Sequence, residues 1–208
     1  MDPALAIRGF VLGFTIAAAV GPISVLVIRR TLVEGRRYGF VSGLGVATAD
    51  ATYGAIAAFG LGAITTALVG ARQILGLVGG AFLLWLAWQT IRAGPADPAT
   101  PAGPRRLGYL GAYLSILGLT MANPMTILSF GALFAGLGVA GGTSGEAALV
   151  VLGVLLGSTT WWAVLTTIVG LSRTRITPRW LHRINVASGV VIGIFAVVSM
   201  ATAVVGVR

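Results

Sequence analysis

The sequence contains no cysteine and a single histidine, His182. Without cysteine the chain can form neither disulfide bonds nor thiol redox centres. One histidine cannot assemble a metal site by itself, and His182 stands among arginines, where a solvated loop residue is the simpler interpretation. We therefore predict neither a bound metal nor a cofactor.

Charged residues are scarce as well. They make up 9% of the 208 residues, while hydrophobic residues make up 57%. A soluble domain carries roughly 25% charged residues. With a mean hydropathy of +0.97, the composition is that of an integral membrane protein that lies in the lipid bilayer.

Uncharged apolar stretches long enough to cross a bilayer, which takes about 20 residues, recur along the chain. We predict an all-α membrane protein with six transmembrane helices. Their expected positions are roughly 5–28, 39–63, 73–92, 108–137, 147–171 and 184–206. Glycines spaced four apart, such as Gly9/Gly13 and Gly153/Gly157, predict close packing between these helices.

The charges also indicate an orientation. Most arginines follow the first, third and fifth apolar segments. Cytoplasmic loops of membrane proteins are enriched in arginine and lysine. We therefore predict a multi-pass protein of the cytoplasmic (inner) membrane with both termini outside the cytoplasm. Because the positive charge is spread over loops in this way, the net charge of +9 does not indicate a nucleic-acid partner.

The two halves of the chain resemble each other in order. "AVGPISVL" (19–26) corresponds to "MANPMTIL" (121–128), and "GVATADATY" (45–53) corresponds to "GVLLGSTTW" (153–161). An odd number of helices per repeat makes the second copy enter the membrane from the opposite face, as in many secondary transporters. We predict two inverted three-helix repeats, residues 1–92 and 108–208, joined by a cytoplasmic linker at 93–107.

A proline interrupts the first helix of each repeat, Pro22 after Gly21 and Pro124 after Asn123. Proline disrupts a helix interior but suits the first turn of a helix. Two breaks at matching positions predict two interrupted helices whose unpaired backbone groups face a cavity. The N-terminus of a resumed half-helix there could hold a carboxylate. The alternative interpretation is a pair of packing kinks, which are common in membrane helices.

Asp50 is the only ionisable residue well inside one of these segments. At ~1.5 Å per residue it lies about 20 Å from Arg37, near the middle of a bilayer. A charged Asp there costs roughly 2.5–3.5 kcal/mol, and such residues are usually functional. Asp50 could exchange a proton with a cavity or pair with a cationic group of a substrate. The alternative is a protonated Asp50 that only bonds across helices to Ser158, its counterpart in the second repeat.

Polar and aromatic neighbours complete the candidate site. Thr48 and Tyr53 share the helix of Asp50, whereas Trp161 and Trp162, which either line the cavity or fill the core, follow Ser158. The candidate substrate- or ion-binding residues are Gly21, Pro22, Thr48, Asp50, Tyr53, Asn123, Pro124, Ser158 and Trp161.

Together these motifs resemble the LysE/RhtB superfamily of amino-acid exporters. The Gly-Pro pair, "RRTLVEGRRYGFVSGLGVATADATYG", "MANPMTILSF" and "GSTTWW" carry the resemblance, which spans essentially the whole chain in order. It implies six spans and efflux of amino acids driven by a proton or ion gradient. It places the family's Gly-Pro at Gly21 and Pro22, its acid at Asp50, and its Asn-Pro at Asn123 and Pro124.

The predicted function is secondary-active export of amino acids or related small zwitterions, coupled to protons or Na⁺. An enzyme is disfavoured because no nucleophile–base pair is visible. Two alternatives stay open: an inorganic cation exporter of the same clan, and a non-transporting membrane scaffold subunit. The sequence does not identify the exported amino acid, the coupling ion, whether Asp50 binds proton or substrate, or whether the chain forms a homodimer.

Overall fold

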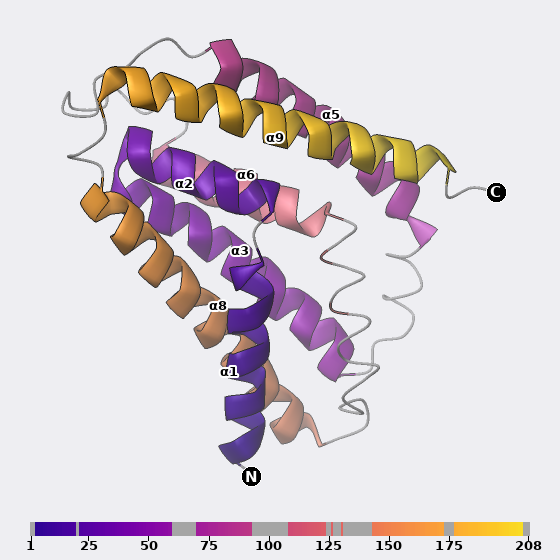
Figure 1. The fold of residues 1–208 in the computed structure, drawn as a ribbon. Helices are drawn as coiled ribbons and strands as arrows, with labels where there is room; N and C mark the ends of the chain where they lie inside the picture. Colours follow the sequence, from indigo (N-terminus) through magenta and orange to yellow (C-terminus); the bar gives the residue numbers. More distant parts are fainter. Residues whose placement is uncertain are drawn as a thin grey trace.

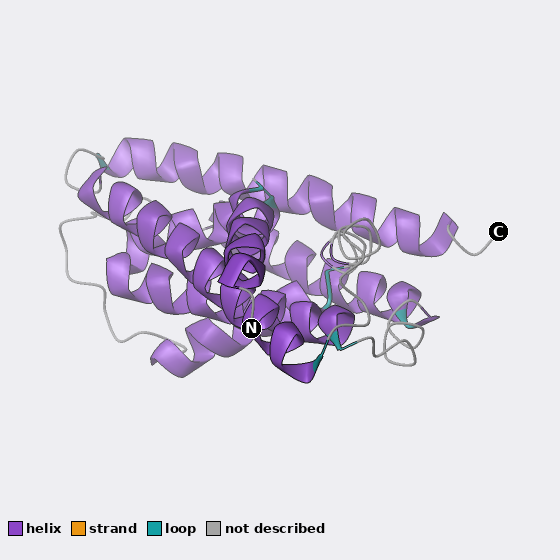
Figure 2. Cartoon of the chain, turned by 90° about the horizontal axis from the view of Figure 1, so that it is seen from below, coloured by secondary structure: helices purple, strands orange, loops and turns teal. Residues whose placement is uncertain are grey.

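The computed structural model describes residues 3–19, 21–59, 70–92, 108–123, 126, 130, 143–172 and 177–205. The predicted all-α structure is confirmed for these residues, in which Figure 2 shows helices and no strand. The helices are α1 (Pro3–Ala18), α2 (Pro22–Glu34), α3 (Arg36–Ala58), α5 (Arg72–Arg92), α6 (Gly108–Met121), α8 (Ser144–Ser172) and α9 (Pro178–Val205) (Figure 1).

Three described helices, α5, α8 and α9, are long and apolar enough to cross a membrane, and α1 with α2 qualifies as one bent span. Helix α3 has 23 residues, but Asp50, glycines and hydroxyl side chains replace many of its large apolar residues. Helix α6 is apolar but short. Helices α5 and α8 coincide closely with the predicted segments 73–92 and 147–171. Helix α2 extends beyond the predicted end at 28, and α9 begins at Pro178, before the predicted 184, so His182 lies in a helix and not in the expected loop. The number of six spans stays a prediction.

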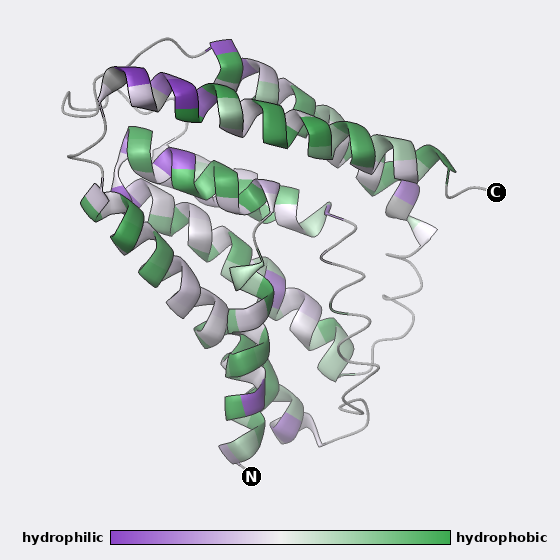
Figure 3. Ribbon diagram, in the orientation of Figure 1, coloured by the Kyte–Doolittle hydropathy of each residue, from purple (hydrophilic) through white to green (hydrophobic). Residues whose placement is uncertain are grey.

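The helices form two groups around α2. Helices α5 and α9 run side by side along one edge, and α1 packs on α8 at the other, with α3 between α8 and α6 (Figure 1). The outer faces of α5, α8 and α9 expose large apolar side chains such as Val78, Leu156 and Ile194. Figure 3 shows the long apolar stretch of α9 and its hydrophilic N-terminal end. Apolar surface of this extent suits contact with lipid.

Glycines bring α1 and α8 into backbone contact, as their spacing predicts. A Cβ atom at Gly9 or Gly13 would collide with the backbone of Val150 or Val154. Reciprocally, a Cβ atom at Gly153 would collide with the backbone of α1. Helices without side chains at the crossing approach closely and gain van der Waals contact, which replaces the missing hydrophobic drive in lipid.

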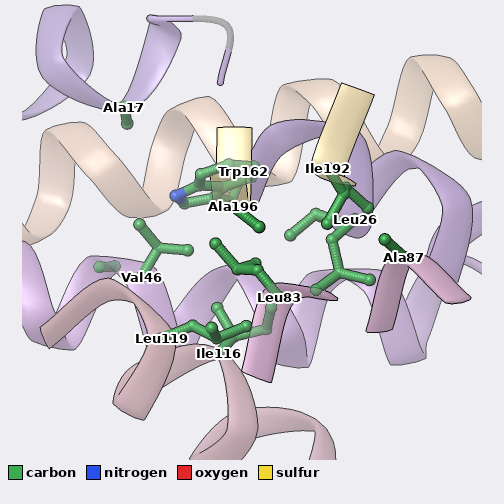
Figure 4. Close-up of a cluster of buried hydrophobic side chains, with 12 residues drawn as sticks. Ala17, Leu26, Val46, Leu83, Ala87, Ile116, Leu119, Trp162, Ile192 and Ala196 are labelled. Carbon is green, nitrogen blue, oxygen red and sulfur yellow. The ribbon is translucent and has the colours of Figure 1, made fainter. Parts of the chain in front are cut away.

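The core of the molecule surrounds α2. Leu26 and Val27 of α2 are fully buried, and they belong to one apolar cluster with Ile116 of α6, Trp162 of α8 and Ile192 of α9 (Figure 4). Helix α2 therefore sits where the two groups of helices meet, which places the helix break at its beginning deep inside the molecule.

The structure corrects the expected end of the first segment. We expected Arg29 and Arg30 to follow it, but α2 continues to Glu34 and contains both. Arg30 is only 7% exposed. The helix continues because protein groups replace water around these side chains: Arg29 Nε donates to Asn185 Oδ1 of α9 at 3.0 Å, and Arg30 bonds to α3 and α6. Asp50 is therefore not the only ionisable group buried among the helices.

Candidate functional site

The predicted break at Gly21-Pro22 is present. Helix α1 ends at Ala18, α2 begins at Pro22, and their axes differ by 78°. Gly21 is the extended N-cap residue of α2, with φ −135° and ψ −177°, and no side chain caps the helix. Pro22 fits this position because it has no N–H to satisfy. The N–H groups of Ile23 and Ser24 thus have no acceptor within α2, as in any first helical turn.

The second predicted break lies at the end of α6. The helix stops at Met121, and the N–H of Asn123 turns back to donate to the carbonyl of Thr120 at 3.1 Å. The Tyr53 hydroxyl donates to the carbonyl of Met121, which satisfies one of the acceptors that a helix C-terminus leaves open. Pro124 lies outside the described residues, so the resumption of this helix after it stays a prediction.

A cavity of about 240 Å³ joins the two breaks to the buried acid. Gly21 and Pro22 line it at the start of α2, Asn123 lines it beyond the end of α6, and Asp50 lines it from α3. The remaining lining residues are Ile16, Ala17, Ala19, Ile23, Ser24, Val46, Thr120, Thr126, Trp162 and Phe195. Four of the nine residues proposed from the sequence therefore meet at one cavity.

Asp50 is 1% exposed and has one protein hydrogen bond among the described residues. The Ser158 hydroxyl of α8 donates to its Oδ2 atom at 2.7 Å. If the predicted repeats are correct, this bond joins equivalent positions of the two halves. The alternative interpretation of Asp50 includes this bond. However, Asp50 also lines a cavity, and a purely structural Asp50 would not require a cavity beside its carboxyl group.

Pro124 lies outside the described residues, and the other four proposed residues lie near the cavity without lining it. Thr48 accepts a hydrogen bond from the Tyr113 hydroxyl of α6 at 2.9 Å. Tyr53 donates a hydrogen bond to the last residue of α6. Ser158 donates to Asp50, which itself lines the cavity. Trp161 packs edge-on against Phe14 of α1, with ring centroids 5.4 Å apart.

Three lining residues that were not proposed have a signal in the sequence. Ser24 and Thr126 occupy the same place in "AVGPISVL" and "MANPMTIL", two residues after the proline, so the repeat marked both hydroxyls. Ser24 donates to the carbonyl of Ala19 at 3.3 Å across the break. Trp162 adjoins Trp161, and both follow Ser158 by about one helical turn. The packing of α8 against Gly43 of α3, and not the periodicity of the sequence, places Trp162 at the cavity.

The described residues contain no group of three or more His, Cys, Asp or Glu side chains that could hold a metal ion. Among the described lining residues, the polar groups are instead one carboxyl, several hydroxyls, an amide, an indole N–H and the open start of a helix. Such a set can bind a small molecule with both a cationic and an anionic group.

Comparison with known proteins identifies the family. The sequence model of the LysE type translocator matches residues 14–202. The chain belongs to this family. It is also 29% identical over 173 residues to "Uncharacterized membrane protein YahN" of Escherichia coli (strain K12), which covers 82% of this chain and 78% of that protein. No solved structure matches the chain significantly. Membership in a LysE family of translocators makes this chain a multi-pass membrane transporter and confirms the resemblance found in the sequence.

Proposed function

We propose that this LysE-family protein is a secondary-active exporter of amino acids or related small zwitterions in the cytoplasmic membrane. The observation that carries the proposal is the cavity itself, where the open start of α2 and the buried Asp50 border one space. A helix N-terminus attracts an anion, and a buried carboxylate attracts a cation. An α-amino acid carries both groups.

In the proposed complex, the substrate carboxylate lies near the start of α2 and receives hydrogen bonds from the N–H groups of Ile23 and Ser24. The substrate ammonium group lies at Asp50, whose Oδ2 atom is held by Ser158. The other carboxyl oxygen of Asp50 has no protein donor among the described residues, so it can accept a substrate N–H or a proton. Because one carboxyl group serves both, loading of substrate and of protons would compete, which couples export to a proton gradient.

The packing of the helices supports the proposed inverted repeats of residues 1–92 and 108–208. If the halves correspond, a contact between the first segment of one repeat and the second segment of the other must occur twice. Helix α1 belongs to the first segment of repeat one and packs on α8, the second segment of repeat two. Helix α6 belongs to the first segment of repeat two and packs on α3, the second segment of repeat one, so the contact occurs twice. The third segments, α5 and α9, pack on each other. Two such halves could rock about the cavity and expose it to each side in turn.

The arginines of the α2–α3 connection support the proposed orientation. Arg36 and Arg37 begin α3 directly after α2, and the loop rich in positive charge is expected on the cytoplasmic side. In this orientation residues 93–107 are a cytoplasmic linker and both termini lie outside. Substrate would enter from the side of Arg36 and leave on the side where α1 begins.

Transport by the purified protein tests the proposal. The full chain is reconstituted in liposomes, and movement of radiolabelled valine, threonine and lysine is followed with and without an imposed pH gradient. We expect at least one amino acid to move faster than in protein-free liposomes, and an uncoupler to abolish the acceleration by the gradient. Parallel liposomes report Cd²⁺, Mn²⁺ and Ni²⁺ with a trapped indicator. Movement of these ions without movement of any amino acid would favour a cation exporter, and movement of nothing would favour a scaffold.

A further inference from the structure

Trp162 carries a buried hydrogen-bond donor that has no acceptor in the described part of the chain. The residue is 1% exposed and lines the cavity, and its Nε1–H has no partner among the described residues. Figure 4 shows the indole nitrogen on the side of the ring that faces Ala17 and Val46, two further lining residues. A buried indole N–H normally has a partner, because leaving it unpaired costs free energy. An unpaired donor at a cavity therefore points to a ligand that completes it.

The position of this ring is fixed by the packing of α3 on α8. Gly43 faces it, and a Cβ atom at Gly43 would lie 2.5 Å from the Cβ atom of Trp162. Asp50 follows Gly43 by two helical turns, and Trp162 follows Ser158 by one, so each pair shares a face of its helix. The same helix interface thus holds the Asp50 carboxyl group and the Trp162 ring. Both are presented to the cavity by rigid elements.

The rest of the cavity offers little to a charged side chain. Among its described lining residues, Asp50 is the only ionisable one, and Ile16, Ile23, Val46 and Phe195 supply apolar surface. If Asp50 pairs with the substrate's α-ammonium group, a second ammonium would be buried without a partner, at a high cost. The volume of about 240 Å³ corresponds to roughly eight water molecules at ~30 Å³ each. A short aliphatic amino acid such as valine has a comparable number of non-hydrogen atoms.

We propose that Trp162 is a substrate-binding residue: its indole N–H donates to the substrate carboxylate, and its ring forms part of an apolar wall that selects neutral, short aliphatic amino acids. This proposal rests on the proposed function, since it names the substrate class of the same cavity. The carboxylate would then lie between the start of α2 and the Trp162 nitrogen, with the ammonium at Asp50.

Trp161 provides a matched control for this role. Its indole Nε1 is also buried without a partner among the described residues, but its ring packs against Phe14 and does not line the cavity. Trp161→Phe and Trp162→Phe therefore remove the same N–H group from neighbouring positions of α8, and both keep an aromatic ring. The thermal unfolding midpoint of each purified variant measures any general loss of packing.

The experiment measures valine transport by wild type and both variants in liposomes. We expect Trp162→Phe to raise the half-saturating valine concentration about tenfold, as the loss of one hydrogen bond to a charged group implies. Trp161→Phe should stay within twofold of wild type by the same reasoning, because it loses no substrate contact. Isobutylamine, which is valine without its carboxylate, should inhibit wild type and Trp162→Phe equally, and lysine should compete weakly.

Equal valine affinity in wild type and Trp162→Phe would overturn the hydrogen bond, as would equal losses in both variants. Stronger competition by lysine than by valine would overturn the proposed selectivity. These outcomes differ from failure of the proposed function, in which wild type itself moves no amino acid. If Trp162→Phe lowers the unfolding midpoint more than Trp161→Phe, the isobutylamine comparison still decides, because a misfolded cavity would weaken its binding as well.

Discussion

Two buried charged residues, Arg30 and Asp50, differ in how completely the protein surrounds them. Arg30 donates to the hydroxyl of Ser42 and the carbonyl of Ala112, each at 3.0 Å, and to the hydroxyl of Ser115 at 2.9 Å. Its guanidinium also lies 5.9 Å from the centre of the Tyr38 ring. Asp50 accepts one hydrogen bond from the described residues, that of Ser158, and borders a cavity.

The contrast separates a structural ion from a candidate binding group. A buried charge that is surrounded by hydrogen-bond partners can fix the positions of the elements that supply them. Arg30 does this for α2, α3 and α6. A buried polar group with few partners is costly, and natural proteins keep such groups mainly where a ligand or a proton completes them. By this criterion we assign Asp50 to the proposed transport cycle and Arg30 to the framework around it.

The largest expected effect is on transport when Asp50 loses its charge. Asp50→Asn preserves the shape and can still accept from Ser158, so the protein should reach the membrane at normal levels. Transport should fall by roughly ten- to a hundredfold, because a hydrogen bond to a charged group contributes about 1.5–3 kcal/mol. Liposome flux and immunoblots of membrane fractions measure the two quantities. Wild-type flux in Asp50→Asn would remove this residue from the mechanism.

For Arg30 the expected effect is on stability. Arg30→Gln cannot reach Ser42, Ser115 and the Ala112 carbonyl together, so it should lower the free energy of unfolding by about 2–4 kcal/mol. The unfolding midpoint in detergent, compared with that of the exposed Arg8→Gln control, measures this loss. A variant as stable as the control would show that the three bonds contribute little, and the distinction between the two buried charges would fail.

Sequence patterns located the break at Gly21-Pro22, and they gave the bond between Asp50 and Ser158 as part of the alternative interpretation of Asp50. Proline chemistry and the correspondence of short motifs are local signals. They could not separate Trp161 from Trp162, since both adjoin the same hydroxyl and the choice depends on which face of α8 meets α3. They also misjudged Arg30. A window of apolar residues ends at any charge, whereas the actual helix α2 continues because distant residues on α3 and α6 solvate that charge.

The smallest expected effects come from the serines that bond to Asp50 and Arg30. One substitution should lower mainly transport and the other mainly stability. Ser158→Ala removes the only described donor to Asp50, so valine flux should fall a few-fold, while stability changes by about 1 kcal/mol or less. Ser42→Ala removes one of three partners of Arg30, so stability should fall by about 1 kcal/mol while flux stays normal. Both serines are fully buried, and each substitution removes one hydroxyl. The free-energy cost of the small void that is left should therefore be similar in the two variants. Flux assays and unfolding midpoints on both variants give the comparison. If both variants lose stability and flux to the same extent, Asp50 and Arg30 serve the fold in the same way. If Ser158→Ala loses mainly flux and Ser42→Ala loses mainly stability, the result assigns transport to Asp50, the buried charge with fewer partners.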